Sequence, residues 1–124
     1  MAQKASGRLE DYHKSLSPPD TVQLFLVAVN QKDRHIVELL LHTQAETELS
    51  AEWLDEKILT VRPLGETPAS RIPNDALEAL FKTRVAISRK GAPPQGIWFW
   101  WSLARTAPTG AWFIKDIQPE AVIR

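Results

Sequence analysis

The sequence predicts an α+β fold, in which N-terminal helices pack on a curved antiparallel sheet. Apolar residues recur at helical spacing between residues 18 and 41. Two aromatic-rich, β-prone runs follow at 96–106 and 111–117, and a Pro/Gly break at 107–110 separates them. Such a pair of runs is typical of an antiparallel hairpin. Because helical and strand patterns occupy separate parts of the chain, we expect an α+β arrangement.

The bulk composition limits the classes of function. The 124 residues suffice for one domain, and 15 Lys plus Arg balance 15 Asp plus Glu. A nucleic-acid binder should carry an excess of positive charge, so no nucleic-acid partner is expected. Zero net charge also gives little repulsion against self-association. The chain has no cysteine, which excludes disulfides and cysteine-based zinc sites.

Residues 1–16 are polar and are expected to form a flexible leader before a single domain at 17–124. The longest apolar run, Leu24–Val29, is far shorter than the roughly 20 residues of a membrane helix, so no membrane span is expected. The N-terminus has no apolar signal core. The compartment stays open: secreted or envelope-attached if a signal was removed, and cytoplasmic otherwise.

The first helix is expected to begin after Ser17. Ser17 suits the cap position, Pro18 suits the first helical position, and Asp20 brings a carboxylate to the positive end of the helix. Its apolar residues recur at i, i+3, i+4 and i+7, and they are Val22, Phe25, Leu26 and Val29. This stripe predicts a helix that is well buried.

Shorter elements follow the first helix. A polar break at 30–33 ends it, and Asp33 is expected to cap a second helix. Ser50 is expected to cap a third helix, which carries Trp53. A β-prone run at 58–61 begins the first strand.

The segment 77–87 fits two patterns. Its alternating apolar residues predict a strand, whereas apolar residues three and four apart also suit a helix. We favour the strand, because 83–87 is β-prone and the Pro/Gly segment 91–94 is typical of a hairpin loop. A helical first turn at 75–80 stays open.

Two segments carry a family resemblance. PPDTVQLFLVAVNQKDRHIVELLL has a helix, an Asn/Lys/Asp break and a second helix that begins at an Asp, and GAWFIKDI has a Gly and a Trp before alternating apolar residues. Together they resemble a bacterial member of the nuclear transport factor 2-like superfamily, over roughly residues 17–119. The resemblance implies a cone-shaped domain whose sheet wraps a long helix. Members include enzymes, small-molecule binders and secretion-apparatus parts, so it implies no single function.

Enzymes of this superfamily place Asp, His or Tyr inside the cone, and this chain offers few candidates. His13 lies in the leader, and His35 and His42 lie two turns apart on the second helix. That separation is roughly 10 Å, too long for one metal ion. We therefore expect no catalytic residue, no metal site and no cofactor. The candidates for residues that line a pocket in the cone are Trp53, Phe81, Trp101 and Asp116.

Asp116 is the one acid in the final strand, where alternation groups it with Trp112 and Ile114. A buried Asp at that position could act as a base with a raised pKa. Residues near the end of a final strand more often lie at a bulge or at the rim of the sheet.

The strand at 97–103 is apolar on both faces, because Trp98 and Trp100 alternate with Phe99 and Trp101. Helices can cover one face, and the other needs a partner subunit, a ligand, the leader or the aliphatic stems of Lys82, Arg84 and Arg105 in cation–π contact. We expect a homodimer through the sheet, as is common in the resembled superfamily; an apolar small molecule or another protein stays open. The expected ligand or interface residues are Trp98, Trp100, Arg84 and Arg105.

The sequence thus predicts a non-catalytic binding or protein-interaction domain, as the soluble part of a bacterial secreted or envelope-attached protein. The alternative is a small isomerase, dehydratase or hydrolase that acts on an apolar ligand in the cone pocket. A cavity that holds an Asp or His with a shifted pKa would favour the enzyme. An interior filled by Trp and Leu side chains would favour the binding domain.

Overall fold

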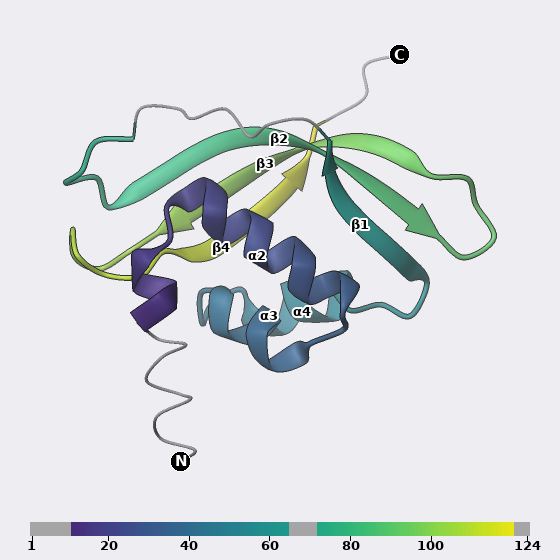
Figure 1. The fold of residues 1–124 in the computed structure, drawn as a ribbon, viewed down its shortest axis with the longest axis horizontal. Coiled ribbons are helices and arrows are strands. Elements are labelled where there is room, and N and C mark those ends of the chain that lie inside the picture. Colours follow the sequence, from purple (N-terminus) through teal and green to yellow (C-terminus); the bar gives the residue numbers. More distant parts are fainter. Residues whose placement is uncertain (1–10, 65–71, 121–124) are drawn as a thin grey trace.

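The computed structural model describes residues 11–64 and 72–120 and has the α+β fold that the sequence predicts (Figure 1). Helices lie against one side of a curved four-stranded antiparallel sheet, with strand order β1-β2-β3-β4. The elements are α2 (Pro18–Asn30), α3 (Arg34–Leu40), α4 (Glu46–Trp53), β1 (Ile58–Leu64), β2 (Glu78–Arg89), β3 (Gln95–Ala104) and β4 (Phe113–Pro119).

Helix α2 begins where its sequence predicts. The Ser17 hydroxyl accepts a hydrogen bond from the Asp20 amide at 3.2 Å, and Pro18 lies in the first turn. The helix ends at Asn30, and Lys32 then takes a left-handed φ of 54°. Non-glycine residues adopt this conformation only rarely, and here it turns the chain sharply into α3.

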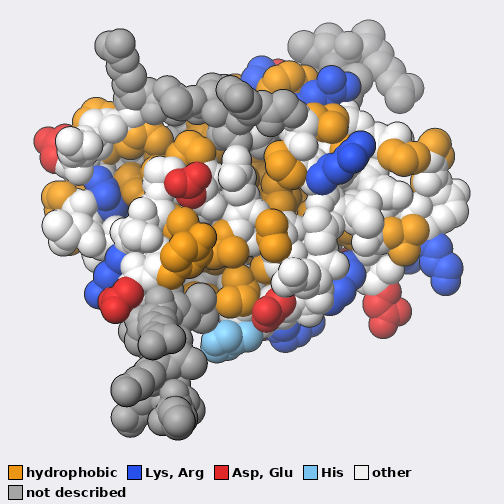
Figure 2. Space-filling view, viewed as in Figure 1, with side chains coloured by type: hydrophobic (Ala, Val, Ile, Leu, Met, Phe, Trp, Pro, Cys, Tyr) orange, Lys and Arg blue, Asp and Glu red, His pale blue; other side chains and the backbone are white. Residues whose placement is uncertain are grey.

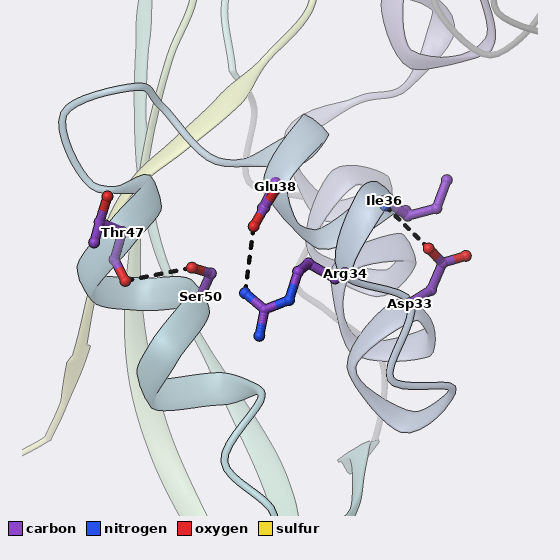
Figure 3. Close-up of polar contacts among 6 residues, drawn as sticks. All are labelled: Asp33, Arg34, Ile36, Glu38, Thr47 and Ser50. Atoms are coloured by element: carbon purple, nitrogen blue, oxygen red, sulfur yellow. Dashed lines mark hydrogen bonds and ion pairs between the residues drawn. The ribbon is translucent and has the colours of Figure 1, made fainter.

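Helix α3 is capped as expected, but α4 starts earlier than predicted. The Asp33 carboxylate accepts from the Ile36 amide at 3.2 Å (Figure 3). Ser50 lies inside α4, where its hydroxyl donates to the Thr47 carbonyl, so its predicted role as an N-cap is wrong. The helix has acidic residues in its first turn, and these stabilise its positive end without a side-chain cap.

Residues 78–87 are part of a strand, and 75–77 form no helical turn, so the helical alternative for 75–80 is wrong. Strand β2 starts at Glu78 and pairs along its length with β3, with Phe81 opposite Trp101. The predicted loop at 91–94 connects the two strands, and Gly91 in it has a φ of 77°, which glycine adopts without strain.

The inner face of the sheet and the helices enclose an aromatic core. The rings of Phe25 and Trp101 meet edge to face at 5.9 Å between centroids, and those of Trp53 and Phe99 at 5.3 Å. The buried Trp101 Nε1 donates to the Thr83 hydroxyl at 2.7 Å, so the largest core side chain has its polar atom satisfied. The core thus uses the inward-facing residues that the alternation of β2 and β3 predicts.

Both edges of the sheet have local covers among the described residues. On β1, the Asn30 amide group donates to the Val61 carbonyl and accepts from the Val61 amide. On β4, Leu41 forms an isolated parallel bridge with Ile114, and the His42 amide donates to the Ile114 carbonyl at 2.8 Å. These bonds occupy backbone groups that would otherwise be free to pair with another chain.

Residues 11–15 form a helical turn that contacts the start of β4. His13 is only 3% exposed, its Nε2 lies 2.6 Å from the Trp112 carbonyl oxygen, and its ring packs edge-on against Phe113. Burial lowers the pKa of His13, and the hydrogen bond to the Trp112 carbonyl acts in the opposite direction with less effect. We did not expect this contact from the polar composition of the segment. The boundary expected at residue 17 stays a prediction, since residues 1–10 lie outside the described residues.

Replacing Phe25 tests the placement of α2. Phe25→Ala should lower the free energy of unfolding by about 3–5 kcal/mol, because it leaves a cavity between α2 and the aromatic core. The measurement is chemical denaturation followed by circular dichroism. Val27→Ala on the same helix is the control, because Val27 is 49% exposed and its loss should change stability little. An unchanged stability of Phe25→Ala would contradict the core described above.

Protonation of His13 should weaken the attachment of the N-terminal turn. Because the pKa of His13 in the folded protein lies below its ordinary value of 6.5, the neutral ring is the form that the folded state favours. Its contribution to stability is present above pH 6.5 and is lost as the pH falls through the lowered folded pKa. Denaturation measured from pH 8 to about pH 4 should show this loss in the wild type. It should be absent in His13→Gln, which can still donate to the Trp112 carbonyl but does not titrate; an identical pH profile would exclude the effect.

Candidate functional site

The outer face of the sheet, which is turned away from the helices, carries an exposed pair of tryptophans. Trp98 and Trp100 are 43% and 39% exposed. Phe99, which lies between them, and Trp101, which follows Trp100, are buried. Strand alternation produces this division. Among the described elements, no helix packs on this face (Figure 1). We call Trp98 and Trp100 the indole pair.

Lys82 lies over both members of the indole pair. It is in register with Trp100, and its Nζ is 5.1 Å from the ring centroid of Trp98 and 5.5 Å from that of Trp100. The same ammonium forms an ion pair with Glu120 at 3.3 Å. Cation–π contacts at such exposed positions contribute about 0.5–1 kcal/mol. Lys82 therefore holds the two rings in a defined arrangement, and its register opposite Trp100 is the sequence signal that points to it.

Arg84 lies beside the indole pair, in register with Trp98. Its guanidinium group lies across Gly96, with Nε and Nη2 only 2.9 Å from the position that a Cβ atom of residue 96 would take. A side chain at position 96 would displace this guanidinium. The absence of one therefore lets Arg84 lie flat on the outer face next to Trp98.

Arg105 is not part of this surface. Its guanidinium lies 4.3 Å from the ring centroid of Trp112 and donates to the carbonyls of Ala76 and Asn74, each at 2.7 Å. The structure therefore groups three of the four predicted interface residues, Trp98, Trp100 and Arg84, and separates Arg105 from them. Lys82, one of the basic residues named as possible covers of this face, lies over the rings.

Three of the predicted pocket residues belong to the aromatic core. Trp53, Phe81 and Trp101 are buried, and they pack with other core side chains instead of lining a wide cavity. A hollow of about 150 Å³ reaches Trp53 beside Ile58 and Phe99. Trp53 Nε1 is buried and has no hydrogen-bond partner among the described residues. Aromatic and aliphatic side chains thus fill most of the space between helices and sheet.

Asp116 does not share a face with Trp112 and Ile114. A β-bulge shifts the pairing of β3 with β4 between Ser102 and Leu103, and it leaves Lys115 as an extra residue. As a result Ile114 and Ile117 both point inward, and Asp116 is partly exposed in register with Ser102. Its carboxylate accepts hydrogen bonds from the Ile117 amide and from Gln118, both close neighbours in the chain. The simple alternation expected for this strand fails at the bulge.

The three histidines lie apart in the structure. His35 is exposed on α3, His42 accepts a hydrogen bond from the Gln44 amide at Nδ1, and His13 is buried against β4. Within residues 11–64 and 72–120, no group of three or more His, Cys, Asp or Glu side chains has the arrangement of a metal site. The polar contacts around α3, which include the Arg34–Glu38 ion pair in Figure 3, join neighbouring turns of helix.

The helices of the described chain are too short or too polar to cross a membrane. No protein-family model matches this chain, and no curated protein sequence matches it either. A solved structure is similar: the solution structure of a SEC-C motif-containing protein from Rhodopseudomonas palustris. It shares 17% sequence identity and a TM-score of 0.59, over 86% of this chain and 80% of the other. At that identity the likeness concerns the fold alone.

The similar structure overturns the resemblance to the nuclear transport factor 2-like superfamily. The neighbour is a SEC-C motif-containing protein, and none of the three comparisons points to that superfamily. The physical reason is that the residues behind the resemblance form common local units. An amphipathic helix pair and a Trp-bearing hairpin specify an α+β class, which the structure has, but they do not specify a family.

Replacing Asp116 tests whether its carboxylate has a role beyond the bulge. Asp116→Asn should change the free energy of unfolding by less than about 1 kcal/mol, because the carboxylate is partly exposed and its bonds are local. The measurement is thermal and chemical denaturation, combined with a screen for hydrolase and isomerase turnover. His35→Ala, on exposed α3, is the parallel variant. A turnover that either change abolishes would contradict the non-catalytic reading of both residues.

Proposed function

We propose that this chain is a non-catalytic protein-interaction domain that binds through the outer face of its sheet, and that its partner is a second copy of the same chain. The observation that carries the proposal is the indole pair, two adjacent tryptophans that remain about two-fifths exposed in the middle of the outer face. A contiguous exposed apolar surface of this kind is typical of an interaction site. Leu80 on the neighbouring strand is more exposed still and extends the apolar surface.

The energetics favour an interface larger than the indole pair itself. A buried tryptophan removes about 150–250 Å² from water, so roughly 60–100 Å² of each indole is left for a partner. At about 25 cal/mol per Å², the pair contributes about 3–5 kcal/mol. Association costs at least about 4 kcal/mol, so the rest of the outer face must take part. A stable interface buries about 800 Å² per partner, which is consistent with contact across most of this face.

The rest of the molecule also favours association through the face of the sheet. Asn30 on one edge and the segment 41–42 on the other occupy backbone groups that a strand from another chain would need. The net charge is zero, so two copies repel each other little. On the side of the molecule seen in Figure 2, basic and acidic side chains are interspersed and form no continuous field of one sign. The aromatic filling of the interior supports a binding domain over an enzyme with an internal pocket.

Replacing the indole pair tests the proposal. The wild type should be dimeric by sedimentation velocity at tens of micromolar, and Trp98→Ser/Trp100→Ser should give a folded monomer, because the change removes the apolar centre of the interface. Circular dichroism checks the fold of each variant. The matched control is Val27→Ser, which removes an exposed apolar side chain from α2 and should leave the dimer intact.

Two results would contradict the proposal. One is a wild type that stays monomeric at high concentration. The other is a dimer whose dissociation constant does not change when both indoles are removed, because association would then use another surface.

A further inference from the structure

The outer face is uneven along β3. Its outward residues are two large ones, Trp98 and Trp100, with small ones on either side. The small ones are Gly96, Ser102 and Ala104. The indole pair therefore forms a ridge. Beyond it lies a hollow of about 250 Å³, lined by residues that include Leu80, Ser102, Glu78 and Lys115.

The charges on the outer face are divided in the same direction. Arg62 and Arg84 lie at the end near Gly96, and neither makes an ion pair or side-chain hydrogen bond to any described residue. We call them the basic end. At the other end, Glu78 is opposite Ala104 and Asp116 is opposite Ser102. We call Glu78 and Asp116 the acidic end.

The ion pairs already present leave this division in place. Lys82 pairs with Glu120 in the middle of the face, so the centre is close to neutral. Lys115 pairs with Glu78 at 3.1 Å, but the Glu78 side chain stays 75% exposed and can accept a second cation. Asp116 has no basic partner among the described residues and bonds to neutral groups. Counting the described residues, one end of the face thus has positive charge without a partner and the other has negative charge without one.

We propose that two copies pair face to face about a two-fold axis that lies in the interface and runs across the strands. The ridge of each copy then enters the hollow of the other, and the basic end of each faces the acidic end of the other, with Arg84 over Glu78. This inference rests on the proposed function and specifies how the two copies are oriented. The axis runs along the row of Phe81 and Trp101, which is midway between Arg84 and Glu78 along β2. A half-turn about that row exchanges the rows of Arg84 and Glu78, which lie about 20 Å apart at 3.3 Å per residue.

The alternative is a two-fold axis parallel to the strands, which places like ends of the two copies over each other, and it meets two obstacles. Ridge would then lie against ridge, which leaves the hollows empty and reduces the contact area. The basic ends of the two copies would lie over each other, and like charges brought together at an interface are unfavourable. A two-fold interface also uses one surface patch on both copies, so it closes as a dimer.

A charge-swap experiment tests the orientation. The basic-end variant is Arg62→Glu/Arg84→Glu, and the acidic-end variant is Glu78→Lys/Asp116→Lys. Each variant alone should associate at least about tenfold more weakly than the wild type, because both of its end contacts become repulsive. Mixed one to one, the two variants should form a heterodimer. At one end the wild-type charges face each other, and at the other end both charges are swapped, so each contact again joins opposite charges. Native mass spectrometry with one variant isotope-labelled measures the two homodimers and the heterodimer separately.

The controls separate folding, charge and orientation. Lys14→Glu/Arg34→Glu changes the net charge by the same amount as the basic-end variant but on exposed residues outside the outer face, and it should keep the wild-type dimer. If Glu78→Lys/Asp116→Lys fails to fold by circular dichroism, the single changes Arg84→Glu and Glu78→Lys are mixed instead, with the same expectation.

The outcomes distinguish this inference from the proposed function. A wild type that is monomeric, or a dimer that survives the loss of both indoles, contradicts the proposed function and with it the orientation. A dimer that depends on the indole pair but tolerates each charge variant overturns the orientation alone. So does a loss of both homodimers without recovery of a heterodimer in the mixture.

Discussion

Strand β3 is apolar on both faces, and the rest of the structure depends on this constraint. Its inward side chains, Phe99 and Trp101, need a cover, and α2 and α4 supply it through Phe25 and Trp53. The one polar atom that this packing buries at Trp101 finds the Thr83 hydroxyl on β2, the strand that alternation brings into register. The helices of the described chain lie on that one side of the sheet. Of the described residues, Lys82 is the one whose cationic group lies over the outward tryptophan rings, and a cation–π contact of this kind orders an indole without removing it from water.

Local patterns predicted most of the fold, because the relevant physics is local. The cap at Ser17, the apolar stripe of α2 and the alternation of β2 each depend on residues a few positions apart, and the structure has all three. The start of α4 was missed because Ser50 is a good cap by type, while acidic residues one turn earlier already stabilise a helix end. Grouping Asp116 with Trp112 and Ile114 was wrong because a single extra residue at a bulge reverses the faces beyond it, whereas the expectation of a bulge or the rim for such a residue was right. The residues around Ser102 do not indicate where the bulge lies, because the register shift depends on how β3 and β4 pair.

For the candidate site too, local patterns predicted some of the residues, and the others depend on contacts between distant parts of the chain. Alternation alone put Trp98 and Trp100 on the outer face, and the structure has them there. Which cations lie beside them depends on the register of β2 against β3. That register places Lys82 and Arg84 next to the tryptophans, whereas Arg105 contacts Trp112. The burial of His13 against the Trp112 carbonyl joins residues 99 positions apart, and the polar surroundings of His13 gave no sign of it. The family resemblance failed for the opposite reason: it used local units that many α+β proteins share, while a fold neighbour can have the same architecture at 17% identity.

An exposed apolar face on a chain of zero net charge is a hazard for solubility unless its association ends at a finite size. The covers at the two sheet edges, Asn30 on β1 and the segment 41–42 on β4, reduce open-ended strand addition. A two-fold contact through the face would complete that protection, because both copies bury the same patch and leave none free for a third. The division of charge along the face matters for the same reason. Its ion pairs would add little affinity at exposed positions, but they would penalise the orientations that let copies stack in series. In this chain, the tryptophans would supply the attraction and the arginines and acids would limit it to one geometry.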